Sequence, residues 1–294
     1  MMAGMNGAQG GSGTRDTNET SGAHGASSAL GATGARDAPD ADGARGGVGD
    51  AVHGARGVYD PQGAFARLVL ETMPEESRVG LTLGFVRTFG IPEIARVLGS
   101  TGRMTNEPRS RAKATGVAMF GLIGQGLESA EGRRIVEDLR RVHDRPDITP
   151  ELMRYVLACF TVCPLRFIDC HGHRPVTAEE RDAAYTFHLS LSDALGLSDS
   201  SDGQLDGVER WMSEYESRHF APSEAGRTLW EATSRGLLAA RLPAPLAGLA
   251  PAVAASLLDE PLRTALEVRR PPAPVRALVT YALRARARSR RSAS

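Results

Sequence analysis

The sequence has no long hydrophobic run, no excess of either charge, few cysteines and almost no lysine. Its 294 residues carry 35 basic and 35 acidic side chains, so the formal net charge is zero. A protein that binds nucleic acid mainly through counterion release needs a basic excess, which is missing here. Lys113 is the sole lysine, and we attribute the arginine bias to base composition. We therefore expect no nucleic-acid partner.

The cysteines and the N-terminal residues bear on the cellular compartment. Cys159, Cys163 and Cys170 are an odd number of thiols without CxxC spacing, so a disulfide framework is not expected. The opening MMAGMNGAQGGSGTRD lacks the basic and apolar regions of a signal peptide. No window reaches the roughly 20 apolar residues that a membrane-spanning helix needs. The expectation is a soluble cytoplasmic protein.

Residues 1–57 differ in composition from the rest of the chain. They are almost wholly Gly, Ala, Ser, Asp, Thr, Asn and Arg, and they contain no Phe, Trp or Tyr. Such a segment cannot bury enough apolar surface to offset the loss of chain entropy on folding. We predict a disordered tail over residues 1–57 and one ordered domain over residues 58–294.

From Tyr59 onward, turn and capping signals separate segments of helical periodicity. Asp60 and Pro61 fit an N-cap and first helical position, and Thr177 with Glu180 fits a capping box. We find no alternating strand pattern and no repeat, so the predicted fold is all-α, with about ten helices around one core. The expected helices cover about 63–73, 76–89, a short stretch after Pro92, 107–125, 129–143, 151–168, 177–195, 203–219, 224–240, 246–258 and 275–289.

A single histidine ends the basic segment EDLRRVHDRPDI. Ile135, Leu139 and His143 are spaced four apart, so they share one helix face, and Val136 lies close to it. The charged residues of this helix fall on other faces. His143 is therefore expected on the apolar side, either as a core histidine bonded to a carbonyl group or as a metal or haem ligand. Periodicity is compatible with both.

The preceding helix holds a second candidate pair. Arg111 and Thr115 are four residues apart and share a face that Met119 and Leu122 continue into apolar territory. One interpretation is a surface ion pair of Arg111 and a back-bonded threonine. The other places both side chains at the polar edge of a cavity, where a guanidinium group can bind a carboxylate.

Taken together, these residues carry a resemblance. Arg111-x-x-x-Thr115, followed by His143 at the end of RRVH, resembles the catalytic family of MpaB and the rubber oxygenases (latex-clearing proteins). The resemblance extends over about residues 76–285 and is closer to the bacterial MpaB-like members. Further segments that carry it are FVRTFGIPEIARVLGSTGRMTNEPRSRAKAT, FIDCHGHRPVTAEERDAAYTFHLSLSDALGL, YESRHFAPSEAGR and DEPLRTALEVRRPPAP.

The resemblance implies an all-α, globin-like core that carries one haem b. It implies that His143 is the axial ligand of the haem iron and that Arg111 and Thr115 line the haem pocket. Studied members of the family use dioxygen to cleave carbon–carbon double bonds in isoprenoid chains. In such proteins the cofactor supplies the oxygen chemistry, and the chain supplies the ligand, a dry pocket and orientation.

The sequence departs from the rubber-cleaving branch at two places. In that branch a lysine directly precedes the threonine, whereas here Ala114 does. Lys113 is offset by one residue, a rotation of about 100° on a helix, so the lysine's role is not carried over. Glu93 lies in the region of the carboxylate proposed as a base in that branch, but its spacing to Arg111 differs.

Other histidines and a cysteine are weaker candidates. Cys170, His171 and His173 cluster in FIDCHGHRP, but the spacing is unlike that of zinc sites, and the resemblance places the run in a loop between helices. His188 and His219 are expected to be packing or surface residues.

The C-terminal RALVTYALRARARSRRSAS predicts a short amphipathic helix that bears Leu278, Tyr281 and arginines. We expect a terminal helix packed on the core with a solvated basic end. The alternative is weak attachment to an anionic membrane surface.

The leading hypothesis is a haem b-dependent oxygenase that acts with dioxygen on a hydrophobic small molecule, such as an isoprenoid or another unsaturated compound. His143 would bind the iron, and Arg111 and Thr115 would act in the pocket. Two rival hypotheses remain. One is a haem-binding sensor or carrier without turnover, and the other is a haem-free helical protein that binds lipids or partners.

Overall fold

The computed structural model describes residues 58–100, 102, 108–197, 203–238 and 248–292; for residues 108–111 and 236–238 it describes the backbone alone. Twelve α-helices and no strand occur in this part of the chain, which confirms the predicted all-α class. No described helix is both long and apolar enough to cross a membrane. The predicted disordered tail lies outside the described residues, and the division at residue 58 stays a prediction.

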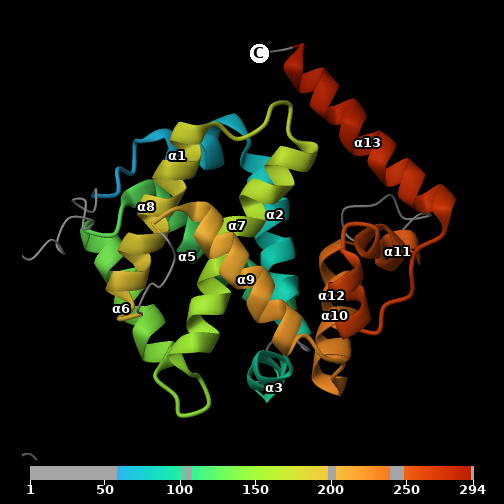
Figure 1. Cartoon of the computed structure of the whole chain (residues 1–294), viewed down its shortest axis with the longest axis horizontal. Helices are drawn as coiled ribbons and strands as arrows, with labels where there is room; N and C mark the ends of the chain where they lie inside the picture. Colours follow the sequence, from blue (N-terminus) through green and yellow to red (C-terminus); the bar gives the residue numbers. More distant parts are fainter. Residues whose placement is uncertain (1–57, 101, 103–107, 198–202, 239–247, 293–294) are drawn as a thin grey trace, which may run out of the picture. The chain divides into compact units, whose positions relative to one another are not determined.

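Two helices, α2 (Pro74–Arg87) and α7 (Pro150–His171), lie side by side at the centre of the described helices (Figure 1). Their backbones meet because glycines face α7. A methyl group on Gly80 would lie 2.4 Å from the Cα atom of Pro164, and one on Gly84 would lie 2.6 Å from the carbonyl oxygen of Cys159. Such distances leave no room for a side chain, so only glycine allows this packing.

Two hydrophobic clusters flank this central pair. The larger cluster includes Phe65, Leu122 and Phe187 and joins α2 and α7 to α1, α5, α6, α8 and α9. The smaller cluster includes Phe89 and Trp230. It joins α2 to α10, α11 and α12, which lie on the other side of the central pair (Figure 1). The surrounding helices are α1 (Ala64–Arg67), α3 (Pro92–Ser100), α5 (Pro108–Gln125), α6 (Ala130–His143), α8 (Ala178–Ala194), α9 (Leu205–His219), α10 (Glu224–Leu238), α11 (Ala250–Ala255), α12 (Glu260–Ala265) and α13 (Ala273–Arg291).

Capping signals located most helix starts. The Ser129 hydroxyl accepts from the Gly132 amide at the start of α6, and Thr177 and Glu180 form the predicted capping box of α8. The prediction for Asp60 was wrong. Its carboxylate accepts a hydrogen bond of 2.8 Å from the Gln62 amide, so it closes a turn, and α1 begins only at Ala64. A π-helical turn over Leu68–Thr72 then leads into α2.

A buried ion pair ties α2 to α9. The guanidinium group of Arg87 and the carboxylate of Glu216 form two parallel bonds, and that of Nη2 to Oε2 measures 2.6 Å. The side chains are only 11% and 7% exposed. Tyr155 donates to Glu216 at 3.0 Å, and Asp259 accepts from Arg87 at 2.6 Å. Burial opposes the charge of Arg87, but Glu216 outweighs it and raises the pKa of Arg87.

Candidate functional site

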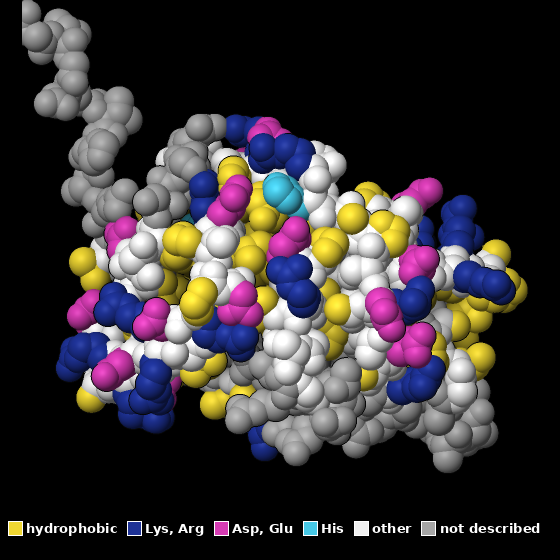
Figure 2. All heavy atoms as spheres, turned by 90° about the horizontal axis from the view of Figure 1, so that it is seen from below, with side chains coloured by type: hydrophobic (Ala, Val, Ile, Leu, Met, Phe, Trp, Pro, Cys, Tyr) yellow, Lys and Arg dark blue, Asp and Glu magenta, His cyan; other side chains and the backbone are white. Residues whose placement is uncertain are grey.

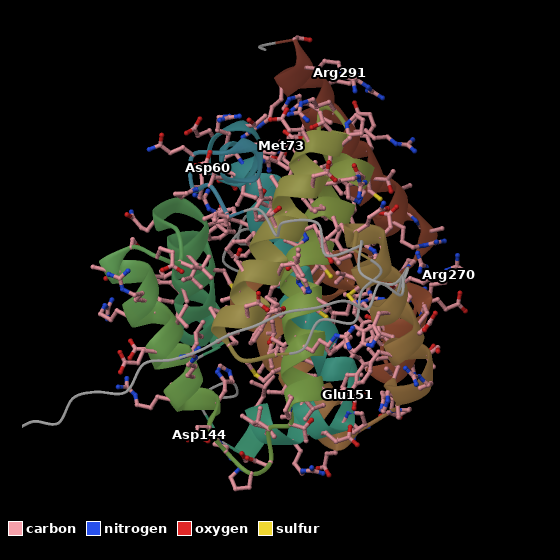
Figure 3. All side chains as sticks on the ribbon, turned by 60° about the vertical axis from the view of Figure 1, so that its left-hand side comes forward. Asp60, Met73, Asp144, Glu151, Arg270 and Arg291 are labelled. Carbon is pink, nitrogen blue, oxygen red and sulfur yellow. The ribbon has the colours of Figure 1, made fainter. Side chains whose placement is uncertain are left out.

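The predicted apolar stripe of α6 forms one wall of a cavity of about 440 Å³, which we call the first cavity. Ile135, Leu139 and His143 all line it, and Val136 beside them is buried. His143 is half-buried at the C-terminal end of α6. Asp144, the next residue, and Glu151, in the first turn of α7, lie at one end of the helices, and Met73 lies at the opposite end (Figure 3).

A hydrogen bond within α6 orients the imidazole of His143. Its Nδ1 atom lies 2.7 Å from the carbonyl oxygen of Leu139, one turn earlier. Because a carbonyl group only accepts, Nδ1 must carry the proton, and in the neutral ring Nε2 then carries the lone pair. Metal-ligating histidines usually bind through one nitrogen while the other donates in this way.

Thr115 brings a second helix to the same cavity. It lies on α5 and lines the first cavity together with Met119, while Leu122, farther along that face, is fully buried. The structure therefore brings together Thr115 and His143, which are far apart in sequence. Arg111 lies one turn before Thr115 in the backbone of α5, and its side chain is outside the described part.

The remaining wall of the first cavity is mostly apolar. Its volume is within the range of about 300–1,000 Å³ that is typical of small-molecule and cofactor sites. An apolar chamber with one imidazole at its wall has the donor set that a haem b site needs, so these residues fit such a group. The apolar lining residues include Ile94, Val97, Leu98, Leu152, Met153, Val156 and Phe160.

Charged residues of α6 also reach the first cavity, which the sequence analysis missed. Arg134 and Asp138 were expected on the solvated faces of this helix, yet both are lining residues, as is Glu131. Arg134 pairs with Glu131 at 2.5 Å and with Asp138 at 3.6 Å. A hydrogen bond from Arg134 holds the pKa of Glu131 below its ordinary value. Glu131 and Arg134 are exposed and Asp138 is half-buried, so the three form a polar rim, and Figure 2 shows such charged side chains interspersed with apolar ones on one face.

The two departures from the rubber-cleaving pattern can now be located. Ala114 lines the first cavity, whereas Lys113 is exposed and lines a second cavity of about 610 Å³. The one-residue offset thus directs the lysine to a different cavity. Glu93 is exposed and lines neither cavity, so its position does not support a role as a base in this structure.

The weaker candidates lie elsewhere. Helix α7 continues to His171, so Cys170 and His171 belong to its last turn, and the expected loop is shorter than predicted. Among the described residues, no three His, Cys, Asp or Glu side chains could hold a metal ion together. His188 is buried, with Nδ1 3.2 Å from the hydroxyl of Thr161, and His219 stacks on a tyrosine, so both pack as predicted.

The predicted C-terminal helix is present as α13. Its Val279, Ala282 and Leu283 line the second cavity, but no residue of α13 is buried, so its packing against the core stays a prediction. Its other side leaves Leu278 and Tyr281 64% and 65% exposed.

Comparison with known proteins finds relatives that are named oxygenases. ER-bound oxygenase mpaB of Penicillium brevicompactum is 30% identical over 181 residues, which are 55% of this chain and 46% of that protein. The protein of the same name from Penicillium roqueforti (strain FM164) is 32% identical over 160 residues, 48% of this chain and 53% of that protein. ER-bound oxygenase mpaB' of P. brevicompactum is 29% identical over 199 residues, 61% of this chain and 46% of that protein. The chain thus spans about half the length of these curated relatives.

A family model covers almost all of the described residues. It bears the description "ER-bound oxygenase mpaB/B'/Rubber oxygenase, catalytic domain", and it matches residues 61–289. That match includes α5 and α6, which form the first cavity around Thr115 and His143. The chain therefore belongs to the MpaB and rubber oxygenase catalytic-domain family.

Proposed function

We propose that this chain is a haem b-dependent oxygenase that uses dioxygen to oxidise a hydrophobic, unsaturated substrate such as an isoprenoid chain. The observation that carries the proposal is the meeting of His143 and Thr115, from two helices, at one apolar cavity. Family membership supports an oxygenase, since the relatives are named ER-bound oxygenases. The cofactor, the co-substrate and the substrate class are our proposals.

His143 would hold the haem through Nε2. The hydrogen bond from Nδ1 to Leu139 keeps the ring in the orientation and tautomer that this role requires, and it makes Nε2 more basic. When bound, the haem iron supplies the activation of dioxygen. The chain's own contribution would be the imidazole of His143 at the wall of a mostly apolar cavity.

Thr115 and Arg111 would act from α5. Thr115 presents a hydroxyl group at the wall of the first cavity, where it can hydrogen-bond to a polar group of the bound molecules. Arg111 would bind a carboxylate at the rim, for which its planar guanidinium group is suited. The apolar walls, with Leu152 and Phe160 among them, would exclude water and orient a hydrophobic substrate.

Oxygen uptake tests the proposal. The full chain, expressed with a haem precursor, should consume dioxygen with squalene but not with squalane, its saturated counterpart, and mass spectrometry should find oxygenated products. A haem spectrum without uptake on any unsaturated lipid would favour a sensor or carrier. A colourless protein that gains no Soret band with added haem would favour a haem-free lipid-binding or interaction protein.

We also propose that α13 attaches weakly to an anionic membrane surface. Leu278 and Tyr281 are exposed apolar residues on a helix whose later turns are rich in arginine, and this combination is typical of interfacial helices. The relatives are named ER-bound, which is in keeping with a membrane-associated role. A membrane surface would also be the place to meet a hydrophobic substrate.

A further inference from the structure

The second cavity lies mostly outside the proposed haem site. It lies between α2, α5, α7, α10, α11 and α13, with a volume of about 610 Å³. Phe85, Thr115 and Val117 line both cavities, so the two share a wall. His143 belongs to the first cavity alone, and an occupant of the second needs no contact with it.

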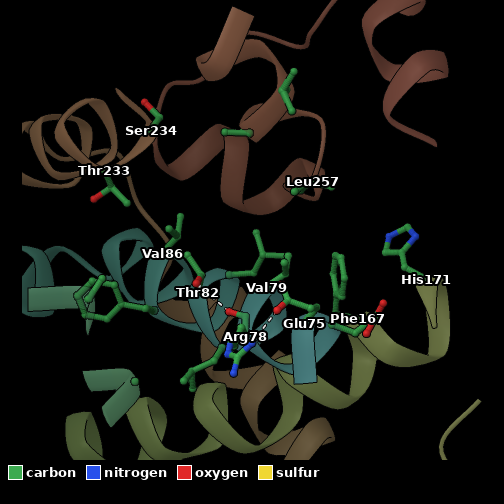
Figure 4. Close-up of a pocket in the computed structure, with 18 of the residues that line it drawn as sticks. Glu75, Arg78, Val79, Thr82, Val86, Phe167, His171, Thr233, Ser234 and Leu257 are labelled. Atoms are coloured by element: carbon green, nitrogen blue, oxygen red, sulfur yellow. Dashed lines mark hydrogen bonds and ion pairs between the residues drawn. The ribbon is translucent and has the colours of Figure 1, made fainter. Parts of the chain in front are cut away.

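The second cavity is elongated. It follows α2 from Glu75 to Val86, a distance of about 16 Å at the rise of an α-helix. In Figure 4, Glu75 and His171 lie at one end, and Val86 and Thr233 lie at the other. This shape suits a long, narrow molecule rather than a compact one.

The two ends differ in charge. At the Glu75 end, Glu75 pairs with Arg78 at 2.6 Å, and Arg286 lies 3.5 Å from Glu76. The residues that α10 and α11 contribute to the lining carry no charge, and they are Trp230, Thr233, Ser234, Val253, Ala254 and Leu257. The exposed ammonium group of Lys113 on α5 also lines the cavity, but α10 and α11 themselves offer a charged group no opposite charge, whereas a neutral polar group could be accommodated beside them.

One side chain at the uncharged end lacks a partner. Thr233 is 2% exposed, and its Oγ1 atom forms no hydrogen bond with any described residue. Other hydroxyl groups on helices bond back to their own main chain: Ser234 donates to the Glu231 carbonyl oxygen at 3.3 Å, and Thr82 donates to that of Arg78 at 2.8 Å. A buried hydroxyl group without a partner is costly, so Thr233 is expected to meet a polar group that enters the cavity.

We propose that the second cavity binds a long, uncharged aliphatic molecule whose single hydroxyl or carbonyl group hydrogen-bonds to Thr233. The aliphatic body would lie along Val79 and Leu257, toward the charged end. A hydroxyl group of threonine can both donate and accept, so it serves either an alcohol or a ketone. The proposal is independent of haem, because none of its residues holds the iron.

Binding of simple probes to the full-length chain tests this site. Decanol, decane and decanoate would be titrated and followed by the fluorescence of Trp230, with Trp211→Phe to remove the other tryptophan. We expect Thr233→Val to lower the affinity for decanol about five- to tenfold, which is the effect of losing one hydrogen bond. The same substitution should change the affinity for decane by less than about twofold. The protein with Thr233 intact should bind decanoate more weakly than decanol.

Three further variants serve as controls. Thr82 lines the same cavity, and its hydroxyl group already donates to the carbonyl oxygen of Arg78. Thr82→Val should therefore leave the affinity for decanol unchanged. His143→Ala should also leave it unchanged, whereas Ala254→Phe should fill part of the second cavity and abolish the response to all three probes. The proposal is overturned if Thr233→Val leaves decanol affinity intact, which would mean that water alone satisfies the hydroxyl group. It is equally overturned if His143→Ala abolishes binding, which would locate the probe in the first cavity.

Discussion

The imidazole of His143 is held by the carbonyl group of Leu139, with 2.7 Å between Nδ1 and the oxygen. This is the bond expected of a core histidine, and it also fixes the tautomer that an iron ligand needs. The position of the ring at the wall of a cavity of about 440 Å³ favours the second interpretation. The assignment of Arg111, Thr115 and His143 to a haem site stays a prediction, and the structure defines the variants that test it.

Arg111 and Thr115 should have separable effects. Arg111→Ala should weaken retention of haem without unfolding the chain, because a bidentate contact to a carboxylate would be lost. Thr115→Val should keep the haem but slow oxygen uptake by about tenfold, the effect of one lost hydrogen bond. Haem retention is measured as the haem content after desalting, and oxygen uptake is measured with an oxygen electrode. If neither value changes in either variant, these residues do not belong to the site.

Gly84 should not tolerate a methyl group. In Gly84→Ala the new carbon atom would meet the backbone of Cys159 at 2.6 Å, and separating α2 from α7 should lower the free energy of unfolding by about 1–3 kcal/mol. Gly99→Ala is the matched control, because its methyl group would have an ordinary contact of 3.9 Å to Ala225. That change should stabilise by about 0.4–1 kcal/mol. Equal effects of both changes in denaturant unfolding would contradict the close packing.

The Arg87–Glu216 pair should matter far more than pairs on the surface. Glu216→Ala leaves Arg87 buried without its partner and should lower the free energy of unfolding by about 3–5 kcal/mol. Glu231→Ala removes an exposed pair with Arg235 and should change it by less than about 0.5 kcal/mol. A thermal or chemical melt that finds the two variants alike would show that the pair is solvated.

Membrane attachment through α13 should depend on its exposed apolar side chains. Replacing Leu278 and Tyr281 with serine should reduce binding to phosphatidylserine vesicles by on the order of tenfold, since both would insert at the interface. Val58→Ser, which changes an exposed apolar residue outside α13, should have no effect. Binding of the wild-type chain should fall as salt rises. Vesicle sedimentation that is insensitive to the double substitution would contradict the attachment.

Local signals in the sequence were sufficient to predict most helices. Thr177 caps α8 where predicted, and Ser129 caps α6 at the predicted start of that helix, because a side-chain oxygen satisfies an amide whatever the rest of the fold does. Asp60 is the exception, since its carboxylate has a nearer amide in a turn. Helix α7 extends beyond its predicted end at residue 168 to His171, and end positions are the least certain part of such predictions.

Contacts between helices could not be read from the sequence in the same way. The stripe of His143 was predictable from a period of four, but the charged rim beside it, with Arg134, was not. Which side of α5 faces which cavity depends on the packing of its neighbours, so the sequence could not show that Lys113 lines a second cavity, which Thr115 also lines. The second cavity has no sequence signal at all, because six helices contribute to it and nothing in the sequence distinguishes Thr233 from other helical residues.

Haem binding by the His143→Ala variant tests the central claim most directly. The full-length wild-type chain, titrated with haem and desalted, should retain one haem with a sharp Soret band and a pyridine haemochrome spectrum of haem b. His143→Ala should lose that band, while His171→Ala, at a histidine of the second cavity, should keep it. A His143→Ala protein with a Soret band of unchanged position and intensity would contradict the account.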